Sequence, residues 1–469
     1  MALLSSSLIL HLGNNMVGAR RRVAAVTRAA AAVDEIGLSG GQELARKNDH
    51  SVMIVGAGIS GLATALALHR LGIGAIVLEQ SDSLRAGGTS LTVWNNAWRA
   101  LEALGVADEL RKKHDQVSGV IVLSKEGRTL QQFQFDECPG GPHDVRALQR
   151  SSLLEALAKP LPPGSIHFDS KLVSVTKSKG CPTLVQLEDG RQFTTKVLIG
   201  CDGVNSVVGK WMGLRDPHYV GQVAIRGVAF YPRGHKHGTT LKQFLGQGSR
   251  AGFVPMTSKK MYWFICFNSS SPGLKITTAE LIKEEALKVV RDWDKSLALE
   301  FSNVLENTSA DTLSRSALRD RWALPVVTPP LAAENITLAG DALHPMTPNL
   351  GQGGCLALED GVILARQIFN AISAGKNTKQ DEEIDNEISA ALLEFAKQRW
   401  SRFFPLTLRS YMTGALLQWD SALVCYARDA FGVKLALRPE RFLDHTLFDC
   451  GSLPTCSEEF REPVNQASN

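Results

Sequence analysis

The stretch that decides the fold is SVMIVGAGISGLATALALHRLGIGAIVLE, residues 51–79. It opens with Ser51–Val55, a short apolar run that is typical of a buried strand. After a glycine-rich turn, Ile59–Leu71 has the apolar spacing of a helix and ends at Gly72, a helix stop signal. Ala75–Glu79 is a second apolar run. The order strand, turn, helix, strand predicts a parallel βαβ unit with a right-handed connection.

The turn inside this unit has the pattern G-x-G-x-x-G, with its glycines at Gly56, Gly58 and Gly61. The first glycine makes the tight turn, the second lets the backbone approach a pyrophosphate, and the third lets helix and strand pack closely. Glu79 at the end of the second strand is suited to accept a hydrogen bond from a ribose 2′-OH, and it would repel a 2′-phosphate. The pattern therefore predicts a site for FAD or NAD rather than NADP, with a purely structural turn as the alternative.

A second motif follows another predicted buried strand, Ile336–Ala339. That strand leads into Gly340-Asp341, a carboxylate at the strand end where ligands bind in open α/β sheets. The loop from Pro348 to Gly354 then supplies three glycines, Gly351, Gly353 and Gly354, before a long predicted helix. The exposed N–H groups and the positive dipole end of that helix can stabilise anionic charge on a bound ring.

Together with the pair Asp202-Gly203, these motifs resemble the single-component (group A) FAD-dependent aromatic monooxygenases. The resemblance is strongest to plant salicylate hydroxylase-like and zeaxanthin epoxidase-like proteins, and it covers roughly residues 50–440. It implies a para-hydroxybenzoate hydroxylase-like α/β fold. Such a fold has a Rossmann-type FAD-binding domain, an inserted and mostly antiparallel β-sheet substrate domain, and C-terminal helices.

The resemblance also implies roles for individual residues in binding FAD non-covalently. The resemblance implies that the FAD pyrophosphate is bound by Gly56, Gly58 and Gly61, with Arg150 near it, and that the adenosine ribose is bound by Glu79. It implies contacts of Asp202 and Gly203 with both FAD and NAD(P)H, and of Asp341 with the ribityl chain. The loop that faces the isoalloxazine ring is implied to contain Pro348, Gly351 and Gly353. The chain departs from the family after Asp202-Gly203, because Asn205 and Gly209 stand where the family usually carries arginine.

The implied reaction is a monooxygenation. NAD(P)H as co-substrate reduces FAD, O2 adds to form a flavin C4a-hydroperoxide, and one oxygen atom hydroxylates or epoxidises a small aromatic or isoprenoid substrate. The flavin carries this chemistry, and no catalytic side chain is identified. His344 is a candidate by its location alone, with a structural role as the alternative. An FAD-dependent reductase or dehydrogenase on the same fold, and a non-catalytic flavoprotein, are the competing hypotheses.

The expected substrate pocket lies between the flavin and the strands of residues 223–268. Strand alternation puts about half of its candidate residues on any one side of the sheet; the candidates are Arg226, Phe253, Tyr262, Trp263 and Phe264. We expect the FAD-binding domain to be discontinuous and to comprise residues 51–125, 145–215 and 325–375. The other expected parts are a targeting or disordered segment at 1–50, the substrate domain at 216–324, C-terminal helices at 376–440 and a tail at 441–469.

The net charge of +4 originates at the amino terminus. Residues 1–33 carry four arginines and no acid, and the rest of the chain has equal numbers of basic and acidic residues. A basic, acid-poor, Ala- and Ser-rich start predicts a transit peptide, for a plastid (chloroplast) first and a mitochondrion second, with a disordered cytosolic tail as the alternative. The composition predicts no nucleic-acid partner, no integral membrane segment and no metal site. Peripheral membrane association, and a monomer or a homodimer, stay open.

Overall fold

The computed structural model describes residues 49–84, 90–273, 276, 278–324, 327–375 and 381–454. The expected targeting segment lies outside the described residues, except for its last two positions, and so does most of the expected C-terminal tail. Among the helices described, none is both long enough and apolar enough to cross a membrane.

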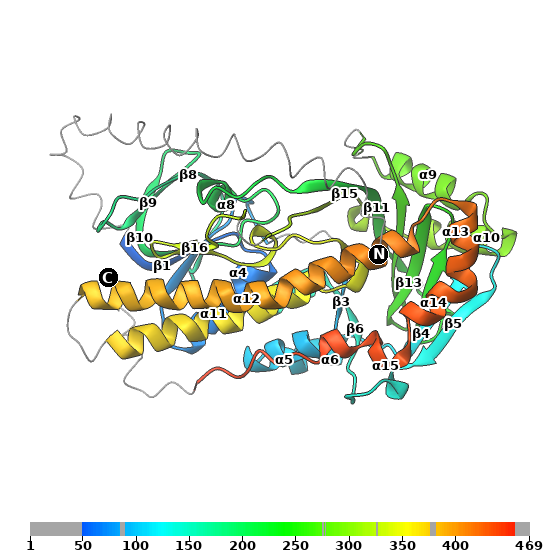
Figure 1. Cartoon of the computed structure of the whole chain (residues 1–469), viewed down its shortest axis with the longest axis horizontal. Coiled ribbons are helices and arrows are strands. Elements are labelled where there is room, and N and C mark those ends of the chain that lie inside the picture. The colour runs from blue at the N-terminus through cyan, green and yellow to red at the C-terminus, as the bar shows by residue number, and fades with distance from the viewer. Residues whose placement is uncertain are drawn as a thin grey trace. The chain divides into compact units, whose positions relative to one another are not determined.

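The quoted segment forms the βαβ unit that its pattern predicts (Figure 1). Strand β1 spans Asp49–Val55, helix α4 spans Ile59–Arg70, and β2 spans Ala75–Leu78. β1 and β2 pair in parallel, with Val52 opposite Ala75 and Val55 opposite Leu78. The strands are apolar because both faces of this sheet are covered by other elements.

β1 lies near the middle of an eight-stranded sheet with the order β16-β17-β10-β1-β2-β7, to which β8 and β9 are attached through β10. The late strand β17 pairs in parallel with β10, so the sheet is completed by a segment far along the chain, as the sequence predicts. The remaining strands are β7 (Ile166–His167), β8 (Leu172–Thr176), β9 (Thr183–Leu187), β10 (Gln192–Gly200), β16 (Ala332–Ala333) and β17 (Ile336–Leu338).

A second sheet of seven strands has the order β15-β11-β14-β13-β12-β4-β5. Its pairings are antiparallel except for the parallel pair β12–β4. It is larger than the expected sheet of residues 223–268, because β4, β5 and β15 join its two edges. Its strands are β4 (Gly119–Ser124), β5 (Thr129–Gln134), β11 (His218–Phe230), β12 (Thr240–Leu245), β13 (Ser249–Thr257), β14 (Lys260–Asn268) and β15 (Ser314–Asp320).

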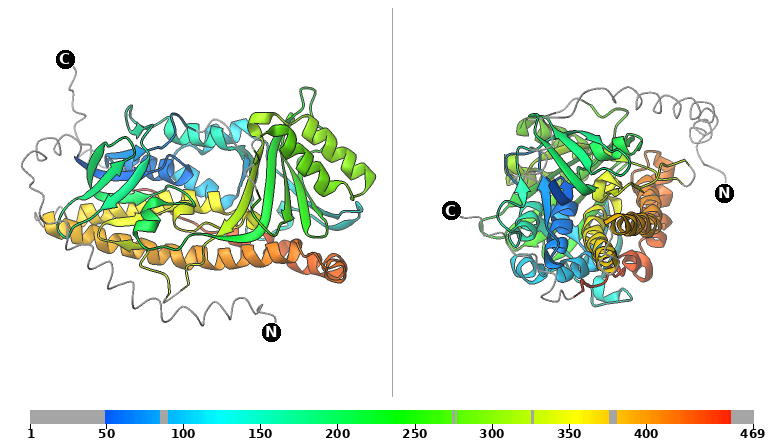
Figure 2. Two further views of the ribbon diagram at one scale, coloured as in Figure 1. Left: turned by 90° about the horizontal axis from the view of Figure 1, so that it is seen from above. Right: turned by 90° about the vertical axis from the view of Figure 1, so that its left-hand side faces the viewer.

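Two helices, α9 (Ala279–Val290) and α10 (Lys295–Glu306), cover one face of this second sheet (Figure 2). Phe253 and Trp263 from the sheet pack with Phe301 of α10 in the core between these layers. The opposite face of the sheet is left for the site described below.

Two long helices, α11 (Gly353–Gly375) and α12 (Asp381–Leu417), pack side by side, and α11 also packs on α4. The mixed α/β fold with C-terminal helices agrees with the predicted fold class. The remaining strands are β3 (Ser90–Val93) and β6 (Arg146–Gln149), and the remaining α-helices are α5 (Asn95–Ala103), α6 (Ala107–Lys113), α7 (Arg150–Ala158), α8 (Val207–Trp211), α13 (Ala422–Ala427), α14 (Val433–Ala436) and α15 (Pro439–Phe442). Short 3-10 turns are η3 (Phe135–Glu137), η4 (Ala310–Thr312), η5 (Gly340–Ala342), η6 (Pro348–Leu350) and η8 (Asp444–Thr446), and η7 (Arg428–Gly432) is a π-helical turn.

Candidate active site

The glycine-rich turn between β1 and α4 is shaped by close backbone contacts. Gly56 has φ +102° and donates its N–H to the carbonyl of Leu78 at 2.7 Å. A Cβ at Gly61 would lie 1.9 Å from the carbonyl oxygen of Gly56, so only glycine fits there. A Cβ at Gly58 would meet no protein atom within 4 Å, and no side chain caps α4 at this residue. The start of α4 therefore faces open space, which suits an approaching phosphate group.

Glu79 lies against the same turn and is buried, with 7% of its surface exposed. Its Oε2 accepts a hydrogen bond from the Ala57 N–H at 2.7 Å, and its Oε1 accepts one from the Ser81 N–H at 3.0 Å. A carboxylate has about four acceptor positions, so two remain for ribose hydroxyls. The contact with Ala57 also ties this acid to the glycine turn.

The Asp202 side chain stabilises the start of helix α8. It accepts hydrogen bonds from the Ser206 hydroxyl and from the Val207 N–H at 2.6 Å, which caps the start of α8. Burial raises the pKa of Asp202 above its ordinary value. Gly203 has φ +79°, and a Cβ there would meet nothing within 4 Å. Arg150 is half-buried as the first residue of α7, a helix that packs on α4.

The second motif forms two loops in front of α11. Asp341, in the turn η5, has an exposed side chain, and Gly351 has φ +63° after the turn η6. A Cβ at Gly351 would lie 3.0 Å from Nε1 of Trp94, which favours glycine there. The Trp94 indole is 6% exposed, and its N–H has no hydrogen-bond partner among the described residues. Such a buried donor suggests a ligand acceptor beside Gly351.

A cavity of about 360 Å³ opens between these loops and the second sheet. One wall carries Asp341, Pro348, Gly351, Gly353 and Gly354, and another wall comes from the face of the second sheet that α9 and α10 leave free. The motif that is expected to hold the flavin ring therefore shares one space with the expected substrate domain.

The candidate pocket residues divide between the two faces of the second sheet, as alternation predicts. Arg226, Tyr262 and Phe264 line the cavity. Phe253 and Trp263 are fully buried in the core on the opposite face, so they do not line it.

A buried cluster of ionised groups supports the Asp341 turn from behind. Asp360 accepts the Gly340 N–H at 2.7 Å through Oδ2, which also contacts Nε2 of His344 at 2.8 Å. Its Oδ1 accepts a hydrogen bond from Nε of Arg399 at 2.6 Å. Burial alone would raise the pKa of Asp360, but His344 and Arg399 lower it to about 2. These contacts hold both ends of the turn that carries Asp341.

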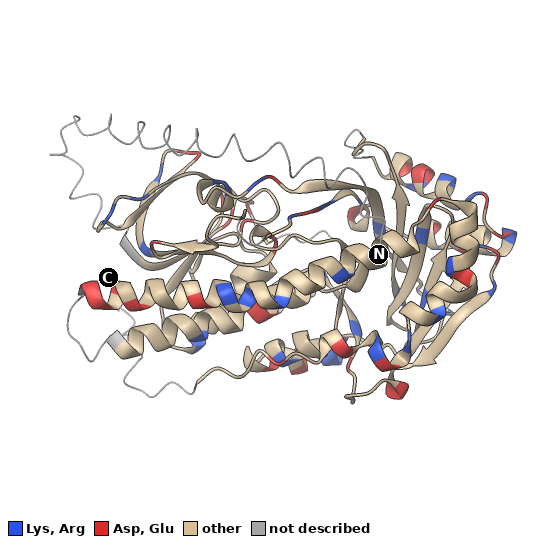
Figure 3. Cartoon of the chain, viewed as in Figure 1, with Lys and Arg blue, Asp and Glu red and all other residues tan. Residues whose placement is uncertain are grey.

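The cluster continues to the glycine loop through Glu359. Glu359 accepts hydrogen bonds from Arg399 at 2.7 Å, Arg402 at 3.0 Å and the Asn96 amide at 2.6 Å. The same amide nitrogen of Asn96 donates to Gln352 at 2.9 Å, in the middle of the Gly351–Gly354 loop. Figure 3 shows basic residues of α12 next to acidic residues of α11. One cluster thus supports both loops of the second motif.

His344 belongs to this cluster and is fully buried. It is absent from the described residues that line the cavity, and its ring lies 5.1 Å from the ring of Phe403. These contacts favour its structural role over a catalytic one. Sequence reasoning missed Glu359, Asp360 and Arg399, although two adjacent acids within an apolar helix are a signal for buried, paired charge.

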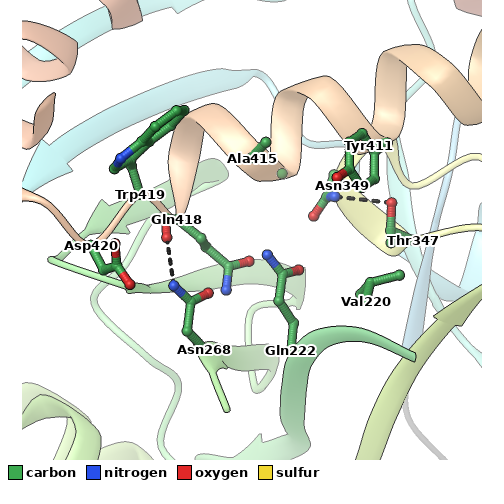
Figure 4. A pocket seen from close by; sticks show the side chains of 11 residues that line it. Val220, Gln222, Asn268, Thr347, Asn349, Tyr411, Ala415, Gln418, Trp419 and Asp420 are labelled. Atoms are coloured by element: carbon green, nitrogen blue, oxygen red, sulfur yellow. Dashed lines mark hydrogen bonds between the residues drawn. The ribbon is translucent and has the colours of Figure 1, made fainter. Parts of the chain in front are cut away.

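A smaller outer pocket of about 250 Å³ lies behind the turn η6 (Figure 4). Side chains from α12, β11 and β14 surround it, with carboxamides from Gln222, Asn268, Asn349 and Gln418. Thr347 and Asn349 line both this pocket and the main cavity, so η6 separates the two spaces.

These features fit FAD. Four features follow one another from the first sheet into the cavity: the open start of α4, the buried Glu79 beside it, the exposed Asp341, and the Trp94 N–H that has no partner among the described residues. The fold and this site define an FAD-binding protein with a cavity beside its glycine loop.

Comparisons with known proteins identify the class further. A family model described as an FAD binding domain matches residues 49–382. Monooxygenase 2 of Arabidopsis thaliana is 42% identical over 407 residues, which cover 86% of this chain and 98% of that protein. The chain therefore belongs to the family of single-component FAD-dependent monooxygenases that contain this domain, and it is an FAD-dependent oxidoreductase.

Two further similarities are more distant. A chloroplastic zeaxanthin epoxidase of an Oncidium hybrid cultivar is 28% identical over 366 residues, covering 75% of this chain and 53% of the epoxidase. The crystal structure of Klebsiella pneumoniae HpxO complexed with FAD and uric acid has a TM-score of 0.68 and 22% identity, covering 81% of this chain and 92% of that one. The latter similarity shows the shared fold.

Proposed function

We propose that the chain uses NAD(P)H and O2 to hydroxylate or epoxidise a small aromatic or isoprenoid substrate in the main cavity. The observation that carries this proposal is the cavity itself, which is bounded by the glycine loop on one side and by Arg226, Tyr262 and Phe264 on another. A flavin ring at the loop and a substrate at the sheet would face each other there. The family membership supports the reaction type.

Under this proposal the glycine turn and Arg150 hold the FAD pyrophosphate, Glu79 holds the adenosine ribose, and Asp341 holds the ribityl chain. Asp202 and Gly203 border the same cofactor, with the Asp202 side chain also capping α8. When bound, the FAD supplies the redox chemistry, which is reduction by NAD(P)H and activation of O2.

The chain itself contributes position, charge and exclusion of water. Gly353 begins α11, so the positive end of a 23-residue helix points toward the loop and stabilises negative charge on a reduced ring. The indole N–H of Trp94 supplies a hydrogen-bond donor beside Gly351. The buried cluster around Arg399 keeps both loops in register, so that the ring and the substrate meet in one geometry.

The purified full-length protein should show a flavin absorption spectrum, and a phenol or isoprenoid that fits the cavity should accelerate its oxidation of NAD(P)H. A screen of both compound classes, with NADH and NADPH in parallel, measures this directly. Accelerated oxidation without an oxygenated product would favour a reductase or dehydrogenase. A flavin-containing protein that never consumes NAD(P)H would favour a non-catalytic flavoprotein.

The amino-terminal segment is proposed to direct the protein to a plastid. Its basic, acid-free composition supports this, and the zeaxanthin epoxidase relatives are chloroplastic by name. A fluorescent reporter fused to residues 1–60 should collect in plastids, while the same fusion with Arg20, Arg21, Arg22 and Arg28 changed to Glu should stay in the cytosol. Mitochondrial signal, or diffuse signal from the unchanged segment, would contradict the proposal.

A further inference from the structure

The outer pocket behind η6 contains a buried hydrogen-bond donor that has no partner among the described residues. Gln418 lines this pocket and is 2% exposed. Its Oε1 accepts a hydrogen bond from Nε of Arg250 at 3.0 Å. Because a guanidinium only donates hydrogen bonds, this contact turns the NH2 group of Gln418 away from Arg250, and its Nε2 donates to no described residue. Such a buried donor calls for an acceptor on a molecule that enters the pocket.

A buried acceptor faces the same pocket from the second sheet. Gln222 of β11 has a buried Oε1 that accepts no hydrogen bond from a described residue. Asn268 of β14 is opposite Gln222 in the sheet, and its Nδ2 donates to the backbone carbonyl of Gln418 at 2.9 Å. Figure 4 shows the carboxamides of Gln222, Asn268 and Gln418 turned toward one space. The pocket therefore offers one donor and one acceptor to a single molecule.

The charge of the lining favours a neutral molecule. No Lys, Arg or His is among the described residues that line the outer pocket. Asp420 is exposed at its edge, where a carboxylate repels an anion. Tyr411 and Trp419 are partly exposed and offer aromatic surface beside the carboxamides. A neutral ligand with a ring therefore fits this lining better than a carboxylate or a phosphate does.

The size of the pocket limits the ligand to about one ring. Its volume is about 250 Å³, whereas pockets for drug-sized ligands have about 300–1,000 Å³. The wall toward the main cavity is held in place by α12. Thr347 Oγ1 lies 2.9 Å from the Ser410 hydroxyl, and Nδ2 of Asn349 donates to the Ser410 carbonyl at 2.8 Å. This wall is therefore formed before any ligand arrives.

We propose that the outer pocket is a binding site for a neutral aromatic carboxamide, separate from the main cavity. The amide oxygen of the ligand accepts a hydrogen bond from Nε2 of Gln418, and its N–H donates to Oε1 of Gln222. A carboxamide satisfies both groups, whereas a ketone of the same shape leaves the Gln222 oxygen without a donor. The inference goes beyond the proposed function and does not depend on it, since Gln222 and Gln418 are absent from the described residues that line the main cavity.

The test uses nicotinamide and 3-acetylpyridine as probes on the full-length, FAD-loaded protein. The second probe has a methyl group in place of the amide NH2, and isothermal titration calorimetry measures both affinities without turnover. We expect nicotinamide to bind at least about fivefold more tightly than 3-acetylpyridine. Gln222→Leu should remove this preference and bring the two affinities within about twofold. The matched control is Gln132→Leu on β5, an exposed glutamine that lines neither space; it should keep the preference.

Ala415→Phe is the second variant, and it covers the case in which Gln222→Leu fails to fold. Ala415 is exposed on α12 and lines the outer pocket, so a phenyl group there fills the space and should weaken both probes at least about tenfold. Equal affinity of the parent protein for the two probes would overturn the proposal. So would a Gln222→Leu protein that still prefers nicotinamide, because the amide would then bind elsewhere.

The same carboxamide occurs in a free amide and at the nicotinamide end of the co-substrate. Competition with NAD+ distinguishes these two sources. Displacement of nicotinamide by NAD+ would assign the pocket to the dinucleotide, and nicotinamide binding that NAD+ leaves unchanged would assign it to a free amide. Absence of NAD(P)H oxidation in the activity screen would count against the proposed function alone, because the calorimetry requires no turnover.

Discussion

Replacing Arg399 by methionine should lower the free energy of unfolding by about 3–5 kcal/mol. The side chain is fully buried and pairs with Asp360 at 2.6 Å and Glu359 at 2.7 Å. Its removal leaves two buried carboxylates without their shared cation, with His344 as the remaining partner of Asp360 and Arg402 as the remaining partner of Glu359. Urea unfolding and Tm measure the loss. Because the cluster supports the Asp341 turn and the glycine loop, the surviving folded protein should also bind FAD more weakly.

The control for this variant is Lys397→Met on the same helix. Lys397 has 81% of its side chain exposed and lies 3.9 Å from Glu394, a surface pair worth about 0–1 kcal/mol. An Arg399→Met protein no less stable than this control would contradict the account of the cluster. Adding Glu359→Gln and Asp360→Asn to Arg399→Met should recover part of the stability, because the uncompensated charges are then gone.

Alanine at Gly61 should destabilise the FAD-free protein, whereas alanine at Gly58 should leave its stability nearly unchanged. A Cβ at Gly61 would lie 1.9 Å from a backbone oxygen, so Gly61→Ala forces α4 away from β1 and should cost about 1–3 kcal/mol or more. A Cβ at Gly58 meets no protein atom within 4 Å, so Gly58→Ala should change the stability of the FAD-free protein by less than about 0.5 kcal/mol.

Both variants should lose FAD affinity by about tenfold or more, which is about 1.4 kcal/mol. The reason differs, because the Gly58 methyl group would occupy the space into which a pyrophosphate approaches, while the Gly61 methyl group distorts the turn itself. Tm of the FAD-free proteins and titration by flavin fluorescence separate the two effects. Undiminished FAD affinity in Gly58→Ala would refute the pyrophosphate assignment.

The local parts of the fold were predictable because their signals are contiguous in sequence. The βαβ unit was predicted to within about two residues, since Gly56–Gly61, the apolar periodicity of α4 and the stop at Gly72 all act over short distances. The strands β4 and β5 were missed. β4 joins the second sheet by pairing in parallel with β12, with Gly119 opposite Thr240. This pairing could not be predicted because no local sequence pattern indicates a partner strand so far along the chain.

The distinction between local signals and long-range pairings also applies to the candidate site. The motif residues around Asp341 and Gly351 could be predicted as candidates because their loops are short and glycine-rich, and both residues line the cavity. Arg250, which lines the cavity, was missed because a lone arginine in a strand looks solvated until its hydrogen bond to Gln418, 168 residues away, is known. The supporting cluster was missed for a similar reason, because Asp360 and Arg399 lie on two helices whose packing sets the pairing. Sequence patterns predict candidate cofactor-binding loops more readily than they predict the buried groups that hold those loops in place.

Isotope labelling tests the central claim, that the cavity beside the glycine loop inserts one atom of O2 into a substrate. The full-length FAD-loaded protein would be given NAD(P)H, 18O2 and a compound that stimulates NAD(P)H oxidation, and the product would be analysed by mass spectrometry. The account predicts a product heavier by one 18O atom, with one NAD(P)H consumed for each product formed. A product without 18O, or with 18O that comes from labelled water instead, would contradict it.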